Sequence, residues 1–331
     1  MHIGIANEET WSFLNEIYAD LNEHHQVSLY QKQTLNLPFF SERINRRIYR
    51  RDWQQFLSKN DVVFFEWASE LLIYASQLPK TCRIVTRLHR YEMYQWVDQV
   101  NWDHVDKIIL VSQAKQNEFC ERFPGQAAKT IVIPEAISVE KFKPVSRPFQ
   151  GDIGILCHLT PRKRVYETIL AFAELLQVQD TYHLHVAGGE HVLHRDYYRA
   201  LQTIVRELGI ESRVTFDGNI TNPESWYKNI DIFLSNSYSE GLQVAPMEAM
   251  ASECYVLSHH WEGAEELLPE QNLFITDREL ISKILEYSSA PERVKHERKA
   301  LLRDRVIRNF NIDQTKVQIR SVIEDAARSQ Q

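Results

Sequence analysis

The chain alternates short runs of apolar, mostly β-branched residues with longer amphipathic stretches, and this alternation constrains the fold more than any other feature. Before residue 150 the apolar runs lie at 2–6, 26–30, 61–67, 83–89, 107–112 and 130–134. After it they lie at 152–158, 182–188, 213–218, 231–236, 255–259 and 273–276. Continuous apolar runs of this length are typical of parallel strands, because helices cover both faces of a parallel sheet. The pattern therefore predicts two parallel sheets.

The stretches between these runs predict the covering helices. In the first half we expect them at 9–24, 42–58, 68–78, 91–100 and 113–122. In the second half we expect them at 164–178, 194–208, 224–229, 244–252, 277–287, 292–309 and 313–328. The expected fold class is α/β, with two doubly wound, Rossmann-like domains whose carboxyl strand ends face a cleft.

The domain boundaries follow from a change in composition. Residues 141–152 hold two prolines and no long apolar run, which is typical of a linker. We expect one domain over 1–144 and a second over 145–310. A helix in 311–331 is expected to pack back toward the first domain.

Composition excludes several classes of protein. The net charge is −7, residues 1–150 are neutral, and neither half is basic, so we expect no nucleic-acid partner. No run of 18 apolar residues and no secretory signal occurs, so no span of a membrane is expected. The four cysteines are far apart and form no CxxC pair, which favours reduced thiols in a cytoplasmic protein.

The segment SEGLQVAPMEAMA (239–251) holds the strongest local signal. Glu240 lies on a loop after a predicted strand, and Glu248 lies in the opening turns of the helix that follows. Free backbone N–H groups at such a helix start favour an anion, for example a diphosphate. Carboxylates repel a phosphate, so these two are expected to contact neutral sugar hydroxyls. Equally, the two glutamates could do no more than complement the helix dipole.

A second signal is HLTPRKRVYETILAF (158–172), which also follows a strand and opens a helix. Arg162, Lys163 and Arg164 stand at the start of that helix, where the macrodipole opposes cations. A bound phosphate would explain them, and a solvated basic turn is the alternative. The sequence shows no HExxH, Asp-x-Asp or GxGxxG pattern, so we expect neither a metal nor a bound cofactor.

Taken together, the motifs of the second half resemble the retaining glycosyltransferases of family four, which have the two-domain B-type fold. The matching pieces occur in the family's order: LTPRK, HVAGGE, RELGIESRVTFDGNI, YKNIDIFLSNSYSEG, the paired glutamates with EAMA, and EGAEEL. The resemblance is strongest over residues 150–290. It implies that the second domain binds a nucleotide-sugar donor and that the first binds the acceptor.

The resemblance also implies roles for single residues. Lys163 would bind the donor diphosphate, Glu248 the ribose hydroxyls, and Glu240 the hydroxyls of the transferred sugar. The backbone N–H groups of Gly241, Leu242 and Gln243 would hold sugar and phosphate. His158 stands where the family has an arginine, and Arg162 or Arg164 is expected to supply the missing positive charge.

In the first half the resemblance rests on TRLHRYEMY (86–94), which places His89 after a strand. His89 would lie near the reacting sugar carbon or the acceptor, and a packed histidine at a strand end is the alternative. Residues 41–56 predict an amphipathic helix with five arginines. Such a helix either contacts the inner face of a membrane or packs as an ordinary solvated helix.

The expected function is a metal-independent, retaining glycosyltransferase that moves a sugar from a nucleotide-diphosphate sugar, with uridine favoured as the base. The sequence leaves the identity of the acceptor open: a saccharide, a lipid-linked group, a small molecule or a protein. The alternative is a noncatalytic sugar-nucleotide-binding subunit of a glycosyltransferase complex.

Overall fold

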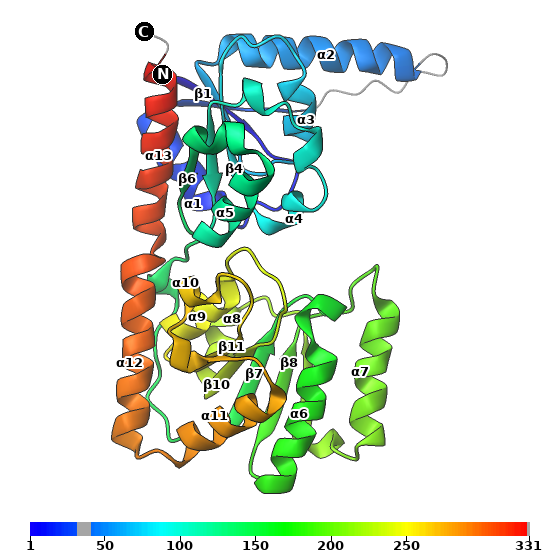
Figure 1. The fold of residues 1–331 in the computed structure, drawn as a ribbon, viewed down its shortest axis with the longest axis vertical. Helices are drawn as coiled ribbons and strands as arrows, with labels where there is room; N and C mark the ends of the chain where they lie inside the picture. Colours follow the sequence, from blue (N-terminus) through cyan, green and yellow to red (C-terminus); the bar gives the residue numbers. More distant parts are fainter. Residues whose placement is uncertain (32–40, 330–331) are drawn as a thin grey trace. The chain divides into compact units, whose positions relative to one another are not determined.

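The structure is a computed structural model that describes residues 1–31 and 41–329, with the side chains of 41–44 left out. It divides into two compact units. Unit 1 comprises Met1–Glu135 and the segment from Ile312 to the end of the chain, and unit 2 comprises Ala136–Asn311. Each unit contains one parallel six-stranded sheet with helices around it (Figure 1), which confirms the predicted α/β fold class.

Unit 1 is built from six strands and the helices that connect them. Its strands are β1 (His2–Ala6), β2 (Gln26–Leu29), β3 (Val62–Phe65), β4 (Arg83–Leu88), β5 (Lys107–Leu110) and β6 (Thr130–Val132). Its α-helices are α1 (Asn15–His24), α2 (Ser41–Lys59), α3 (Glu70–Ser76), α4 (Arg90–Met93), α5 (Gln113–Arg122) and α13 (Ile312–Arg328). The strand order is β2-β1-β3-β4-β5-β6, so the chain reverses direction across the sheet between β1 and β3.

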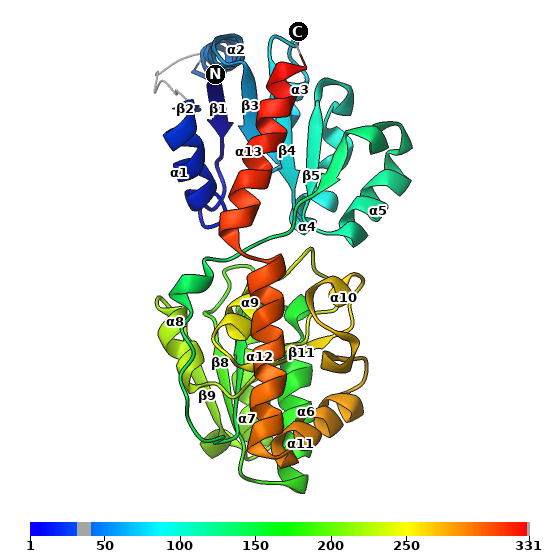
Figure 2. The ribbon, with the colours of Figure 1, turned by 90° about the vertical axis from the view of Figure 1, so that its left-hand side faces the viewer.

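Alternate side chains of these strands enter two separate apolar clusters. Ile3, Ile5, Val62, Phe64, Val85 and Ile109 pack with α1 and α13 on one face. Val63, Phe65, Ile84, Leu88, Ile108 and Leu110 pack with α2, α3 and α5 on the other. This period of two is what a strand buried on both faces requires. Figure 2 shows α13 lying along the sheet beside α1.

Unit 2 repeats the plan. Its strands are β7 (Asp152–Leu156), β8 (His183–Ala187), β9 (Val214–Gly218), β10 (Ile232–Ser235), β11 (Tyr255–His259) and β12 (Leu273–Phe274). Its α-helices are α6 (Val165–Val178), α7 (Arg195–Glu207), α8 (Pro223–Trp226), α9 (Val244–Ala251), α10 (Ala264–Leu267), α11 (Asp277–Ser289) and α12 (Glu292–Asn309). The order β12-β11-β10-β7-β8-β9 places the reversal of direction between β7 and β10.

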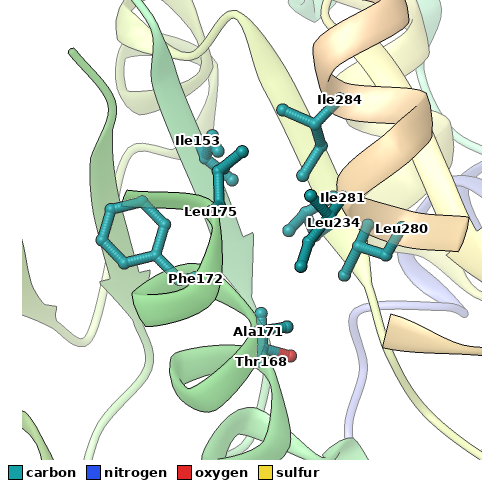
Figure 3. A pocket seen from close by; sticks show the side chains of 9 residues that line it. All are labelled: Ile153, Thr168, Ala171, Phe172, Leu175, Leu234, Leu280, Ile281 and Ile284. Carbon is teal, nitrogen blue, oxygen red and sulfur yellow. The ribbon is translucent and has the colours of Figure 1, made fainter. Parts of the chain in front are cut away.

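Helices α6 and α11 close one face of the second sheet. Figure 3 shows their apolar side chains meeting over β7 and β10, with Phe172 and Leu175 on α6 and Ile284 on α11. The cavity left between them is only about 10 Å³, about the volume that the centre of one water molecule needs. This tight packing fixes the position of α6, and with it the turn that leads into this helix.

The unit boundaries fall at 135/136 and 311/312, whereas the sequence predicts them at 144/145 and 310/311. The linker was expected at 141–152 because that segment is rich in proline and polar residues. In the structure Ile137, Val139 and Phe142 are buried in the apolar core of unit 2. The Ile137 N–H also donates to the Phe310 carbonyl at 3.0 Å, so residues 136–142 belong to unit 2.

Two expected helices of the first half are shorter than predicted. The helix expected over 9–24 begins at Asn15, because side chains before it bond locally instead: Asn7 Oδ1 accepts from the Glu9 N–H at 3.1 Å. Such bonds compete with a helical turn. The helix expected over 91–100 ends at Met93. A short 3₁₀ turn at Val97–Gln99 follows it.

Candidate functional site

The loops after β7 and β10 meet at the point where the second sheet reverses its strand order. In open parallel sheets this switch point is where ligands bind, beyond the carboxyl ends of the strands. Arg162 and Lys163 lie on the 3₁₀ turn Pro161–Lys163 after β7, and Glu240 lies on the loop after β10. Lys163 Nζ is 2.6 Å and Arg162 Nη1 is 2.5 Å from the same carboxylate oxygen, Glu240 Oε1.

Glu240 is ionised despite being only 8% exposed. Burial opposes its charge, but the two cations and a hydrogen bond from Ser237 outweigh burial and lower the pKa of Glu240 to about 2. Arg162 Nη1 also donates to the Ser239 carbonyl at 2.6 Å, which holds the guanidinium against the loop. Arg164 is not part of this cluster: its backbone is left-handed at φ 52°, and it occupies the N-cap position of α6.

The loop at 239–243 presents backbone donors above this cluster. Among the residues that the structure describes, none accepts a hydrogen bond from the N–H groups of Gly241, Leu242 or Gln243. The Gln243 side chain is locked beneath the loop, because its Oε1 accepts from Ser235 Oγ at 2.5 Å and its Nε2 donates to Ser237 Oγ at 3.1 Å. Free N–H groups before a helix favour an anionic or hydroxylic ligand.

Glu248 lies apart from this cluster, on the next turn of α9. Its Oε2 accepts from Tyr227 Oη at 3.0 Å. Burial raises the pKa of Glu248 to about 7, although the hydrogen bond from Tyr227 lowers it in part. Once it is ionised, the buried Glu248 carboxylate readily accepts hydrogen bonds from hydroxyl groups. Tyr227 was not anticipated, because only the fold brings residue 227 to a helix that begins at residue 244.

The loop after β8 borders the same edge of the sheet. Gly188 has φ 135°, and a Cβ there would stand 2.0 Å from the Cys157 carbonyl oxygen, so only glycine fits. His158 follows Cys157, and its ring centroid is 6.2 Å from that of His191. Partial desolvation, and then the charge of Lys163, lowers the pKa of His158. His158 is therefore neutral at pH 7, and the positive charge of the loop comes from Arg162 and Lys163.

In unit 1, His89 directly follows β4 and lies inside a buried cluster of charges. Its Nε2 is 3.2 Å from Glu66 Oε1, and its Nδ1 is 2.6 Å from Glu135 Oε1. Arg87 pairs with the same two carboxylates, at 3.2 and 2.9 Å. Burial opposes the imidazolium, but Glu135 and Glu66 outweigh it and raise the pKa of His89 to about 10. With His89 charged, these four side chains carry no net charge, which lowers the cost of burying them.

Both ring nitrogens of His89 are thus engaged within unit 1, and its ring face stacks on Trp67 at 4.1 Å. Phe13, from the loop after β1, lies 5.5 Å from the His89 ring and 5.8 Å from that of Trp67. These aromatic residues follow β1 and β3, where the first sheet reverses its order. Sequence reasoning missed Phe13 and Trp67, since no motif marks either of them.

Among the described residues, no group of three or more His, Cys, Asp or Glu side chains is placed to hold a metal ion. None of the described helices is both long and apolar enough to cross a lipid bilayer. Of the predicted site residues, the structure brings Arg162, Lys163 and Glu240 into contact. It places Glu248 apart from them, on α9, the helix that follows the loop of Glu240.

Comparison with known families bears on this edge of unit 2. Residues 150–289 match the family model described as glycosyl transferases group 1. Unit 2 contains a glycosyl transferases group 1 domain. The match begins just before β7 and ends with α11, so it includes both switch-point loops of this domain.

Curated relatives cover part of the chain. It is 27% identical over 175 residues to the alpha-monoglucosyldiacylglycerol synthase of Streptococcus pneumoniae, covering 47% of this chain and 38% of that protein. It is 28% identical over 107 residues to the lipopolysaccharide core biosynthesis mannosyltransferase LpsB of Rhizobium meliloti, covering 32% of this chain and 30% of that protein. The chain thus matches well under half the length of these relatives.

A solved structure covers almost the whole chain. HepE of Anabaena, in complex with UDP and glucose, superimposes with a TM-score of 0.78 at 18% identity. The match covers 97% of this chain and 99% of HepE. At this identity the likeness concerns the fold, and the two-sheet α/β architecture is that of HepE.

Proposed function

We propose that this protein transfers a sugar from a nucleotide-diphosphate sugar, with UDP as the favoured nucleotide, to an acceptor hydroxyl with retention of the anomeric configuration. The convergence of Arg162 and Lys163 on Glu240 at the switch point of the glycosyl transferases group 1 domain carries this proposal. The UDP preference is supported by HepE, which has the same fold and was solved with UDP and glucose.

Each side chain of this edge has a place in the proposed reaction. The bond between the anomeric carbon and the diphosphate oxygen breaks, the acceptor oxygen bonds to that carbon, and the acceptor proton passes to the diphosphate. Lys163 and Arg162, rather than a metal, stabilise the departing charge, since fixed cations at a leaving group are an effective electrostatic catalyst. The free N–H groups of Gly241 and Leu242 bind sugar and phosphate, and Glu248 accepts the ribose hydroxyls.

The acceptor belongs to unit 1 in this proposal. Phe13, Trp67 and His89 lie at the carboxyl ends of their strands, and aromatic rings there offer a surface for a sugar or another partly apolar acceptor. His89 acts as a fixed imidazolium, because Glu66 and Glu135 already hold both of its nitrogens.

The experiment that tests the function uses Glu240→Ala. We expect this variant to lose sugar transfer, measured as nucleoside diphosphate released from a panel of sugar nucleotides in the presence of acceptor extract, while it still binds UDP. Transfer at the wild-type rate would refute the role of Glu240. Binding of UDP by the wild-type chain with no release from any donor would favour the noncatalytic binding subunit instead.

We further propose that the protein works in the cytoplasm and contacts the anionic inner face of a membrane through α2. The apolar side of this helix packs against unit 1, where Trp53 and Leu57 are buried, so it is not available to enter a membrane. Four arginines of this helix are exposed to solvent: Arg46, Arg47, Arg50 and Arg51. Attraction to anionic lipid is worth about 1 kcal/mol per basic residue near the surface, so the contact is electrostatic and weakens with salt.

Sedimentation with vesicles tests this contact. Wild-type protein should sediment with vesicles that contain anionic phosphatidylglycerol and not with pure phosphatidylcholine, and replacement of the four arginines by glutamine should abolish binding. A control with the same change in charge replaces four exposed basic residues of unit 2: Arg199, Arg206, Lys228 and Arg278. Equal loss in both variants would show that only net charge matters and would contradict a role for α2.

A further inference from the structure

Glu240 makes contacts that a sugar ligand does not explain. Its Oε1 holds Lys163 Nζ at 2.6 Å and Arg162 Nη1 at 2.5 Å, and these are the cations that the proposed function assigns to the diphosphate. The three side chains are largely withdrawn from water, with exposures of 10% for Glu240, 14% for Lys163 and 27% for Arg162. The carboxylate therefore occupies the position of an anionic partner for both cations.

A carboxylate and a diphosphate cannot both keep this position. Each carries negative charge, and two anions within a few ångströms repel each other strongly where water is scarce. Glu240 remains ionised throughout the physiological range, since its pKa is lowered to about 2. That low pKa depends on both cations, so the carboxylate has to leave them when a diphosphate binds in its place.

We propose that Glu240 is a built-in counter-ion of Arg162 and Lys163, and that the donor diphosphate displaces it from both. This inference rests on the proposed function, which supplies the diphosphate. The Ser237 hydroxyl remains beside the displaced carboxylate, because the Gln243 amide anchors Ser237 from below at 3.1 Å. Glu240 then has free acceptor capacity, and sugar hydroxyls can supply the hydrogen bonds that it has lost.

The exchange makes Glu240 a specificity-determining residue. A complete sugar nucleotide offers hydroxyls to the displaced carboxylate. A bare nucleoside diphosphate leaves it charged, unpaired and close to the phosphates. The chain should therefore discriminate against free nucleoside diphosphate, which is also the product of the reaction, and this discrimination should depend on the charge of Glu240.

The test measures binding of two probes, UDP and inorganic pyrophosphate, by isothermal titration calorimetry. Glu240→Gln keeps the size of the side chain and its hydrogen bonding to Ser237 but removes the charge. We expect both probes to bind the variant more tightly than the wild type, on the order of tenfold, which lies within the usual range of coupling between two groups that compete for or favour one site. Glu270→Gln is the matched control. Glu270 is exposed on the turn before β12, at the amino end of that strand and not at the carboxyl ends where Glu240 lies.

Circular dichroism checks that the variant is folded. Glu240→Ala serves as a second variant with the same expected gain. Equal or weaker probe binding by both variants would overturn the inference while leaving the proposed function intact. Tighter pyrophosphate binding with no binding of UDP would support the inference and refute the uridine preference. Failure of every protein to bind either probe would overturn both proposals.

Discussion

Burial of Glu248 makes the stability of unit 2 depend on pH in a way that one substitution can isolate. Its pKa is raised from 4.5 to about 7, chiefly because burial disfavours the charged form. Between these values the unfolded chain has lost the proton and the folded chain keeps it. Stability from this group is therefore greatest at low pH, and it falls as pH rises from about 4.5 to about 7.

The size of the effect follows from the shift. One pKa unit corresponds to about 1.4 kcal/mol, so the full change is about 3 kcal/mol. Roughly 2.5 kcal/mol of it falls between pH 5 and pH 8, because some of the loss has already occurred at pH 5. Glu248→Gln has no proton to lose. Relative to wild type, the variant should gain about 2.5 kcal/mol of unfolding free energy between these two pH values.

Urea unfolding at pH 5 and pH 8, followed by far-UV circular dichroism, measures this difference. All other titrating groups are shared by the two proteins, so their contributions cancel when wild type and variant are compared at each pH. Glu270→Gln again serves as the control, and it should parallel the wild type. If Glu248→Gln also parallels the wild type from pH 5 to pH 8, the side chain is not desolvated in the folded state, and the reasoning fails.

Two further substitutions test residues beside the sites at the strand ends, Gly188 in unit 2 and Arg87 in unit 1. Gly188→Ala should lower the free energy of unfolding by more than about 2 kcal/mol and weaken pyrophosphate binding, because the added Cβ would meet the Cys157 carbonyl. Gly209→Ala is the control: with φ 68° and open space around it, this change should lower the free energy of unfolding by only about 1 kcal/mol. Arg87→Met should lower the unfolding free energy by about 3 kcal/mol, since it leaves the buried Glu66 and Glu135 with only the His89 imidazolium between them, whereas Arg47→Met on the exposed side of α2 should change it by no more than about 0.5 kcal/mol. Equal costs within either pair of variants, read from urea midpoints, would contradict these assignments.

The fold could be predicted from the sequence because its signal is local and repeated. Each of the two sheets has six strands, and the apolar runs marked all of them, since a strand buried on both faces needs a continuous run of such residues. Element ends were less certain where side chains act locally. Asn7 bonds to the backbone of Glu9 and delays α1, and this competition depends on geometry that an amphipathic pattern does not encode.

Parts of the donor site were predictable for a related reason. Lys163 and Glu240 each follow a strand directly, so a doubly wound order that places β7 beside β10 brings their loops together. The choice between Arg162 and Arg164 was not predictable. These residues are two apart on one turn, and the left-handed backbone of Arg164 turns the chain into α6 at that point. Only Arg162 faces Glu240 as a result.

The charge cluster around His89 shows where sequence reasoning stops. A histidine after a strand suggests a residue with a free ring nitrogen, and this interpretation takes no account of the side chains around it. Glu66 follows β3 and Glu135 follows β6, and these strands lie on opposite sides of β4 and β5. Only the completed sheet brings both carboxylates to one imidazole, and two carboxylates with a single arginine favour the charged form of the histidine. The protonation state of His89, and so the chemistry open to it, is therefore set by tertiary structure and not by its own motif.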